Sequence, residues 1–344
     1  MSAKRKSQPE VIELPEWIRG LPKVELHLHL EGTISPATLV ELSKHQDAPR
    51  LTLRQAEELY HYKDFQGFLL AFKAVSERLR TPTDYELITY KMIQQLAAQG
   101  VAHAEVYVSL GVVYYWKRIE FEPLFEGMER GRERGEREFG VTIYWLFDAV
   151  RHFGVEEAAR VFRKAAELKS AHPSIIGIGI GGDEARGPAD TFRDLYKEAR
   201  ARGLHLTAHA GESTGPESIW GALNIGAERI GHGLSAERDP ELIEVLAERQ
   251  IPIEICVTSN LRTNCWQSAH DHPLRRYFDR GLMVTLNSDD PAMFESNLAG
   301  EFALAHDQFD FTRDHLRELA ANSVEASFLP PERKIDLLRA IESY

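Results

Sequence analysis

Two histidines near the start of the chain have the spacing of paired metal ligands. His27 and His29 lie two residues apart within an apolar run, each flanked by leucines. Strand alternation would send both imidazole rings to one face and the leucines to the other. Two neutral imidazoles with a carboxylate are a common ligand set for catalytic zinc, with one position left for water. A single histidine would more often be a hydrogen-bonded core residue, so the prediction depends on the pairing.

Further candidates stand at the ends of later apolar runs. His209 and Glu212 follow one run, His232 follows another, and Asp289 and Asp290 end the last. His209 and Asp289 would complete a zinc site with the paired histidines. Attack of a zinc-bound water on a heteroaromatic ring needs a base and an acid. His232 is the candidate base, and Glu212 is the candidate acid if burial raises its pKa.

Two of these carboxylates have an ordinary structural interpretation as well. Glu212 could be the capping partner of a helix N-terminus. Asp290 precedes Pro291, and Asp-Pro is a common helix start. The neighbouring His209 and Asp289 favour the functional interpretation of both.

Two other zinc chemistries do not fit the sequence. Nucleic-acid deaminases need His-x-Glu followed by Pro-Cys-x-x-Cys. The two cysteines here, Cys256 and Cys265, form no such pair. The His-Glu-x-x-His string of thermolysin-type proteases is also missing. Both classes are excluded.

The elements that must position these residues repeat along the chain. Eight short apolar runs predict strands at 23–30, 103–110, 141–150, 175–181, 205–211, 229–233, 252–259 and 283–290. Segments with helical spacing separate most of them, as at 155–169, 190–202 and 240–249. This alternation predicts an α/β fold of the TIM type, a (β/α)8 barrel whose reacting groups gather where the strands end. A Rossmann fold is disfavoured because no Gly-x-Gly-x-x-Gly follows the first strand.

Two regions fall outside the strand–helix repeat. Residues 31–101 are too many for one crossover and contain helical patterns at 36–45, 53–60 and 84–99, which predicts a helical cap over the barrel mouth. Residues 295–344 show helices at 302–308, 312–322 and 331–343. We expect one hydrolase barrel domain over 1–344 that includes both regions.

Composition excludes several partners. The chain has 344 residues, with 41 lysines and arginines against 53 acidic residues, for a net charge of −12. This balance disfavours nucleic acid. No apolar stretch is long enough to span a membrane. Two cysteines and the absence of an apolar segment after the basic N-terminal run indicate the cytoplasm. The oligomeric state is left open.

Read as strings, these residues resemble the adenosine deaminase family of the amidohydrolase superfamily. The matching strings are LPKVELHLHLEGTI at 21–34, GGDE at 181–184, HAGE at 209–212, RIGHG at 229–233, TSN at 258–260 and LNSDDPAMF at 286–294. They occur in the family's order and cover most of the chain.

The resemblance implies a role for each matched residue. His27, His29, His209 and Asp289 match the ligands of a single zinc. His232 matches the base that orients and deprotonates the zinc water, and Glu212 the acid that protonates purine N1. Asp290 matches the carboxylate that bonds N7 and the attacking hydroxide, and Gly182 the amide donor to N3. The predicted fourth strand has no lysine to bridge two metals, which favours one Zn²⁺ per subunit. The implied reaction is hydrolytic loss of a purine 6-amino group as ammonia.

Departures from the adenosine-specific pattern bear on which purine is used. Glu31 replaces the usual Asp that contacts the ribose 5′-hydroxyl, and 179–184 reads Gly-Ile-Gly-Gly-Asp-Glu where the family has Asp-Leu-Ala-Gly-Asp-Glu. Trp116 lies in an aromatic and basic cluster at 114–118, which either begins a packed helix or contacts ligand. Aromatic faces beside cations would suit a carboxylated ring. With Arg151 and TSNLRT at 258–263, the chain most resembles the aminodeoxyfutalosine deaminase branch, on the futalosine route to menaquinone.

The same residues rank the other candidate substrates and the other classes of function. Adenosine is the second candidate substrate and free adenine the third. Ester or lactone hydrolysis by another amidohydrolase would use the same metal, but Glu212 and Asp290 around a purine edge argue against it. A catalytically dead binding module is disfavoured because no ligand or acid has been lost.

Overall fold

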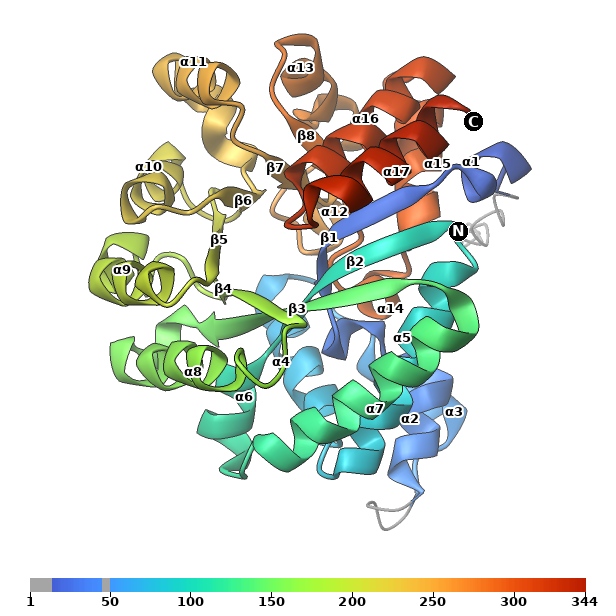
Figure 1. Cartoon of the computed structure of the whole chain (residues 1–344), viewed down its shortest axis with the longest axis vertical. Coiled ribbons are helices and arrows are strands. Elements are labelled where there is room, and N and C mark those ends of the chain that lie inside the picture. The colour runs from blue at the N-terminus through green and yellow to red at the C-terminus, as the bar shows by residue number, and fades with distance from the viewer. Residues whose placement is uncertain (1–13, 45–49) are drawn as a thin grey trace, which may run out of the picture.

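The strands form a barrel in which neighbours in the sequence are neighbours in space. The computed structural model describes residues 14–44 and 50–344. Eight parallel strands follow one another around the sheet in chain order (Figure 1). They are β1 (Lys23–His29), β2 (Val101–Val108), β3 (Thr142–Val150), β4 (Ile175–Gly181), β5 (His205–Ala210), β6 (Arg229–His232), β7 (Ile253–Ile255) and β8 (Val284–Leu286). The predicted (β/α)8 barrel is confirmed.

The last strand region returns to the first and closes the barrel. Leu28 and Asp289 form a parallel bridge. The His29 amide donates to the Asp289 carbonyl at 2.9 Å, and the Asp289 amide donates to the His27 carbonyl at 3.0 Å. Closure therefore brings the histidines that end β1 against the aspartate that follows β8, although more than 250 residues separate them in sequence.

Two predicted strands are shorter than expected. The run at 252–259 forms β7 and then helix α12 (Val257–Arg262), in which the Asn260 amide donates to the Cys256 carbonyl at 3.0 Å. The run at 283–290 forms only β8, which ends at Leu286, and Asp289 further along adopts a φ of +64°, which is incompatible with an extended strand. The apolar runs predicted that these strands exist. They do not show the residue at which a buried strand ends and the chain bends toward the cavity.

Helices surround the barrel between its strands. They are α7 (Glu122–Phe139), α8 (Val155–Leu168), α9 (Arg193–Ala201), α10 (Pro216–Ile225), α11 (Pro240–Arg249) and α13 (Leu274–Asp279), of which α8, α9 and α11 correspond to the segments predicted at 155–169, 190–202 and 240–249. The segment predicted at 190–202 begins as a short 3₁₀ turn, η4 (Ala189–Phe192), before α9. Shorter turns connect other elements: η1 (Glu31–Thr33), η3 (Arg151–Phe153), η5 (Leu234–Arg238) and η6 (Ala269–Asp271).

The segment between β1 and β2 forms the predicted helical cap. It contains α2 (Pro36–Ser43), α3 (Leu53–Leu59), α4 (Phe65–Ser76) and α5 (Pro82–Ala97) (Figure 1). Of these, α4 was not predicted. It begins at Asp64, whose side chain accepts the Gly67 amide at 2.8 Å. The predicted helix 36–45 ends at Ser43, and its last residue lies outside the described part of the chain.

Helix α5 packs closely against α7. A Cβ at Gly127 would lie 2.0 Å from the Pro82 carbonyl oxygen, so this glycine permits the close approach. The connection after β2 continues as α6 (Leu110–Val112) and a π-helical turn, η2 (Val113–Lys117), which contains the aromatic and basic cluster.

The C-terminal region is helical, as predicted. It forms α14 (Pro291–Phe294), α15 (Leu298–Phe309), α16 (Arg313–Ala326) and α17 (Pro331–Glu342). Helix α16 packs against β1 and β8, and α15 contacts the N-terminal α1 (Glu16–Gly20). Within residues 14–44 and 50–344, every helix is too short or too polar to cross a bilayer.

Candidate active site

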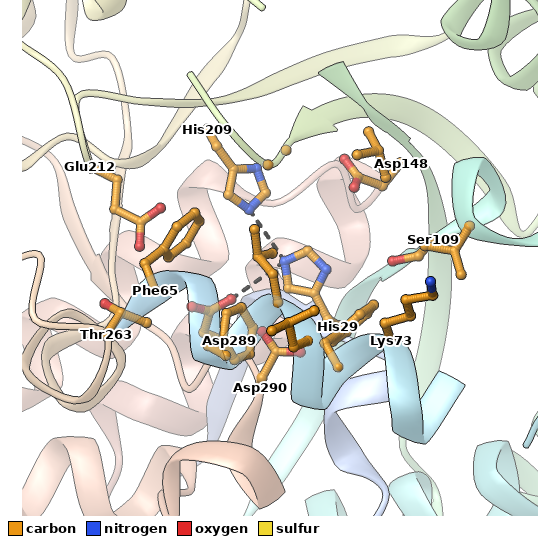
Figure 2. Close-up of a pocket in the computed structure, with 18 of the residues that line it drawn as sticks. His29, Phe65, Lys73, Ser109, Asp148, His209, Glu212, Thr263, Asp289 and Asp290 are labelled. Atoms are coloured by element: carbon orange, nitrogen blue, oxygen red, sulfur yellow. Dashed lines mark hydrogen bonds and ion pairs between the residues drawn. The ribbon is translucent and has the colours of Figure 1, made fainter. Parts of the chain in front are cut away.

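A cavity of about 320 Å³ opens where the barrel strands end, and α4 lines part of its wall. His29, His209 and Asp289 meet inside it, while Glu212 and Lys73 lie on opposite sides of this group (Figure 2). The carboxyl ends of barrel strands are where such folds place their reacting groups. The residues predicted from strand ends are thus brought to one cavity.

The four predicted metal ligands have converging side chains. The Nε2 atoms of His29 and His209 are 3.2 Å apart. Oδ1 of Asp289 lies 3.4 Å from Nε2 of His27 and 3.4 Å from Nε2 of His29. A tetrahedral zinc with ligands at about 2.0–2.1 Å holds neighbouring ligand atoms about 3.3 Å apart. These spacings match what one shared ion requires.

The donor chemistry also fits a metal. His27 is fully buried and its Nε2 has no hydrogen-bond partner among the described residues. His27, His209, His232 and Asp289 together offer ligand atoms within 4.8 Å of one another. Burial lowers the pKa of His29 to about 3, so its ring is neutral and can ligate. An orphaned imidazole nitrogen facing a carboxylate and two other rings is accounted for by a divalent cation.

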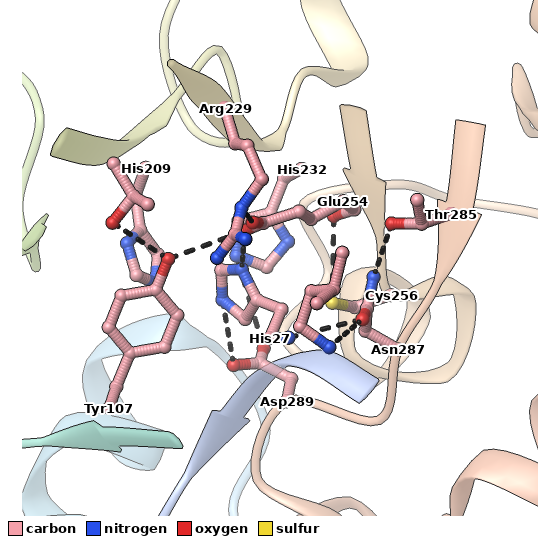
Figure 3. A network of polar contacts seen from close by, with 12 residues as sticks. His27, Tyr107, His209, Arg229, His232, Glu254, Cys256, Thr285, Asn287 and Asp289 are labelled. Carbon is pink, nitrogen blue, oxygen red and sulfur yellow. Dashed lines mark hydrogen bonds and ion pairs between the residues drawn. The ribbon is translucent and has the colours of Figure 1, made fainter. Parts of the chain in front are cut away.

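A carboxylate behind His27 fixes the orientation of its ring. Nδ1 of His27 donates to Glu254 at 2.7 Å, and Glu254 accepts from Nε of Arg229 at 2.6 Å (Figure 3). Arg229 also bonds Glu105 at 2.5 Å, so the buried charges are paired. Although burial alone would lower the pKa of His27, the carboxylates of Asp289 and Glu254 raise it, so a cation bound at Nε2 would take the place of a proton there. Such carboxylate–histidine pairs direct the remaining nitrogen toward a metal.

The sequence prediction missed Glu254 and gave no role to Arg229. A charged residue between the isoleucines of β7 was the available signal, because an acid within a buried strand must have a partner. The fixation of His209 could not be read from sequence. Its Nδ1 donates to the backbone carbonyl of Ile180 at 3.0 Å, and any residue type could supply that acceptor.

Gly231 allows the His27 ring to lie against β6. A Cβ at this position would stand 2.7 Å from Cε1 of His27, too close for any side chain. The glycine before His232 therefore makes room for the ring of a predicted ligand that comes from β1, across the barrel.

Asp289 and His232 are held in strained backbone conformations. Both have a φ of +64°, in the left-handed region that non-glycine residues seldom adopt. The second carboxylate oxygen of Asp289 accepts from the Ser259 hydroxyl at 2.6 Å. Burial would raise the pKa of Asp289, but the surrounding histidines hold it well below its usual range. The carboxylate is therefore ionised, as a metal ligand must be.

The His232 ring faces two acidic groups of the site, Glu212 and Asp289. Its Nε2 lies 3.8 Å from Oε2 of Glu212 and 4.0 Å from Oδ2 of Asp289. Its Nδ1 is 3.0 Å from the side-chain amide nitrogen of Asn260, which restrains the ring. Burial lowers the pKa of His232 to about 4. The imidazole is therefore neutral at neutral pH.

Glu212 has the character required of a proton donor. Its side chain is only 8% exposed. Burial raises its pKa to about 8, with smaller contributions from the charges of Asp289 and Glu184. Glu184 also accepts the backbone amides of Gly211, Glu212 and Ser213 at 2.7–2.9 Å, which fixes the loop that presents Glu212. The carboxyl is protonated at neutral pH.

Asp290 lines the same cavity beside Asp289. Burial and the neighbouring charge of Asp289 raise its pKa well above the usual range. Its Oδ1 has no hydrogen-bond partner among the described residues. Asp290 also precedes α14, so its two sequence interpretations apply together: it lies at a helix start and in the cavity.

The structure separates the predicted substrate-binding residues into two groups. Gly182 and Trp116 line the cavity. Glu31 and Arg151 are not in its described lining. Glu31 accepts the Ser109 amide at 3.2 Å, and Arg151 donates to the His209 carbonyl at 2.5 Å. Each residue therefore binds a backbone group near a strand end, while Nε and Nη1 of Arg151 have no hydrogen-bond partner among the described residues.

Other cavity residues were missed by the sequence prediction. Helix α4 contributes Phe65, Phe68 and Phe72 together with Lys73. Asp148, at the end of β3, is 4% exposed and has an unpartnered Oδ1. The phenylalanines at 65, 68 and 72 have the spacing of one helical face, which was the signal for α4.

Comparison with known proteins agrees with this arrangement. The family model described as adenosine deaminase matches residues 22–344. An aminodeoxyfutalosine deaminase from Streptomyces avermitilis is 37% identical over 335 residues, which cover 96% of this chain and 93% of that protein.

Two solved structures share the architecture. An adenine deaminase from Arthrobacter aurescens superposes with a TM-score of 0.88 at 31% identity, covering 94% of this chain and 98% of its own. An amidohydrolase from Burkholderia ambifaria, solved with bound zinc, has a TM-score of 0.87 at 26% identity, covering 97% and 94% of the two chains.

Proposed function

Because the chain belongs to the adenosine deaminase family, we propose that it is a zinc-dependent aminohydrolase whose substrate is aminodeoxyfutalosine. The products would be futalosine and ammonia, on the route to menaquinone. The observation that supports deamination is the convergence of His27, His29, His209 and Asp289 in one cavity with a protonated Glu212.

The proposed metal site takes one Zn²⁺ per subunit, held by His27, His29, His209 and Asp289. Bound there, zinc would lower the pKa of a coordinated water and supply a hydroxide nucleophile at neutral pH. Glu254 and the Ile180 carbonyl hold the His27 and His209 rings with their Nε2 atoms toward the ion. These contacts set the ligand geometry before substrate arrives.

The surrounding residues would position the purine and move protons. Glu212 delivers its proton to N1 of the ring, so that negative charge does not build up there as C6 is attacked. Nε2 of His232 is the proposed acceptor of the proton from the nucleophile, which requires Nδ1 to carry the ring proton and Asn260 to turn its amide oxygen toward it. Asp290 bonds N7, and the Gly182 amide donates to N3. Burial of these groups keeps bulk water from competing for the same hydrogen bonds.

Free adenine is the second candidate substrate, favoured by the solved adenine deaminase that is 31% identical. The cavity favours the larger substrate. Its apolar wall is lined by Trp116 and by the α4 phenylalanines Phe65, Phe68 and Phe72, of which Phe65 lies beside Glu212 (Figure 2). A bare adenine held at the polar end would leave that wall without a partner.

Ammonia release from four compounds tests the proposal. Aminodeoxyfutalosine, adenosine, 5′-deoxy-5′-methylthioadenosine and adenine should be compared side by side, with zinc content measured on the same enzyme. We expect kcat/KM for aminodeoxyfutalosine to exceed that for adenine by about 100-fold or more, since buried apolar contact contributes 1.5–3 kcal/mol per large side chain. Preference for adenine would overturn the assigned substrate. If no ammonia is released from any of the four compounds, the proposed deamination is wrong.

A further inference from the structure

Three of the acidic groups in the cavity lie around the predicted metal site, away from the cation of the cavity. These are Glu212, Asp289 and Asp290; a fourth, Asp148, is buried near the end of β3, and Lys73 is the single lysine or arginine in the described lining. Figure 2 shows the Lys73 amine directed toward Ser109, across the cavity from Glu212. A substrate held by Glu212 at its purine ring would extend toward this cation.

The Lys73 amine is free to receive an anionic group. Its nearest carboxylate is Oε1 of Glu77, one turn further along α4, at 3.8 Å. That separation is too long for a hydrogen bond, and no other described residue accepts one from Lys73. The side chain is 41% exposed, at the mouth of the cavity. The N–H groups of the Lys73 ammonium are therefore available to bind an anionic group at the far end of a long substrate.

The surface next to Lys73 is aromatic. The amine stands 5.1 Å from the ring centroid of Trp116. Phe68 and Phe72, on the same face of α4, add apolar surface to the lining of the same cavity. An anion that reached Lys73 through this part of the cavity would be attached to an apolar or aromatic arm.

We propose that Lys73 binds an anionic group at the 5′ end of the substrate, a carboxylate on an aromatic ring that lies against Trp116. The inference rests on the proposed function, because N1 at Glu212 and N7 at Asp290 direct N9 and its substituent away from the metal. In this proposal the Lys73 ammonium pairs with the negative charge of the substrate. The aromatic surface packs against the ring to which that charge is attached. A 5′-phosphate is the other anion with this chemistry, and it lacks the apolar arm.

The test removes the charge while keeping the apolar stem. In Lys73→Met, KM for aminodeoxyfutalosine should rise about 10- to 100-fold, as expected for loss of one hydrogen bond to a charged group. The rise for 5′-deoxy-5′-methylthioadenosine should be at least tenfold smaller. Lys73→Arg should restore most of the affinity, since it keeps the charge.

Two control variants separate recognition from support of α4. Glu77→Gln removes the same neighbouring carboxylate contact without removing the cation, and Lys63→Met removes an exposed charge that does not line the cavity. Neither should raise KM for aminodeoxyfutalosine. If Glu77→Gln raises it as much as Lys73→Met, the effect is on the helix and the proposal is wrong.

Salt dependence gives a second measurement. KM of the wild type for aminodeoxyfutalosine should increase as ionic strength is raised from roughly 0.01 to 0.15 M, and that increase should be reduced in Lys73→Met. An identical salt dependence in both proteins would overturn the role of Lys73.

The assay distinguishes failure of this inference from failure of the proposed function. If the wild type uses aminodeoxyfutalosine well and Lys73→Met leaves its KM unchanged, only the inference fails. If the wild type uses AMP in preference and Lys73→Met raises KM for AMP, Lys73 is an anion receptor but the assigned substrate and its aromatic arm are wrong. If adenine is preferred and no anionic substrate is used, both are overturned.

Discussion

The polar end of the cavity and the wall supplied by α4 differ in how the protein holds them. At the polar end three of the four predicted ligands are fixed by a second group: Glu254 holds His27, the Ile180 carbonyl holds His209, and Ser259 holds Asp289. On α4 the cavity side chains belong to a single cap helix, and the Lys73 amine is held only by the ring of Trp116 and a 3.8 Å ion pair to Glu77.

Because of this difference, we expect the barrel strands to determine the reaction and the cap helix α4 to determine which substrate is used. The barrel strands fix the groups that must meet a metal and a purine ring within a fraction of an ångström. The cap helix supplies apolar surface and one cation, which tolerate small displacements because burial of apolar area is not directional. Changes at the polar end should therefore affect every substrate, and changes on α4 should affect only those that reach it.

Loss of a metal ligand is the most severe test of this division. Asp289→Ala removes a carboxylate from the centre of the histidine cluster. We expect metal loss and a fall in kcat/KM of at least about 10³-fold for every substrate, because the metal both generates the nucleophile and stabilises charge. Metal analysis and ammonia release measure both effects. Asp279→Ala, at an exposed ion pair on α13, is the matched control. A metal-loaded, active Asp289→Ala enzyme would contradict the ligand assignment.

Glu212→Gln should keep the metal and lose turnover. The amide occupies the same space but has no acidic proton for N1. We expect kcat to fall about 10²- to 10⁴-fold for all purines, the usual contribution of a positioned acid. Glu217→Gln, exposed on the following helix, should behave as wild type. Normal turnover by Glu212→Gln would remove the assigned acid from the mechanism.

The pH profile tests the same residue without a mutation. Burial, aided by Asp289 and Glu184, raises the pKa of Glu212 to about 8. Catalysis requires the protonated carboxyl, which is present below that pKa and lost above it. On the alkaline side, kcat/KM should therefore fall about tenfold per pH unit above pH 8. A profile that keeps rising to pH 10 would show that the protonated form is not needed.

The two regions also differ in how far sequence could predict them. His27, His29, His209 and Asp289 were found because each ends an apolar run, and a barrel brings all such ends to one rim. Their convergence needed only the fold. Helix α4 lay in a long insertion where other helical segments were recognised, and its phenylalanines resemble ordinary core residues. Nothing in their spacing shows that they would face a cavity.

Supporting residues were missed for another reason. Arg151 and Glu31, which were predicted to contact substrate from their place in the pattern, are absent from the described lining of the cavity and bind backbone groups. Glu254 was overlooked because its partner, His27, is 227 residues away. Partners so distant in the chain are specified by strand order around the barrel, which a single sequence does not display.

Glu254→Gln should have an intermediate effect at the polar end. It removes the charge behind His27 while keeping a hydrogen-bond acceptor, so the ring is held less firmly and is less basic. We expect zinc affinity to fall about 10- to 100-fold, with activity restored by excess zinc. Competition with a chelator measures the affinity. Glu228→Gln, beside Arg229 in the sequence but at a partly exposed pair with His205, is the control. If zinc affinity is unchanged in Glu254→Gln, the Glu254 carboxylate does not support the metal site and its role is only structural.

The smallest predicted effect is on the cap. Phe72→Ala shortens the apolar wall without touching the metal site, so zinc content and kcat should change little. KM for aminodeoxyfutalosine should rise about tenfold, the value of one aromatic contact, while KM for adenine should change much less because adenine ends before the wall. Because α4 is a cap helix, this selectivity would show that substrate choice can vary while the chemistry stays fixed. An equal rise for both substrates would mean that α4 shapes the polar end as well, and the two regions would not be separable.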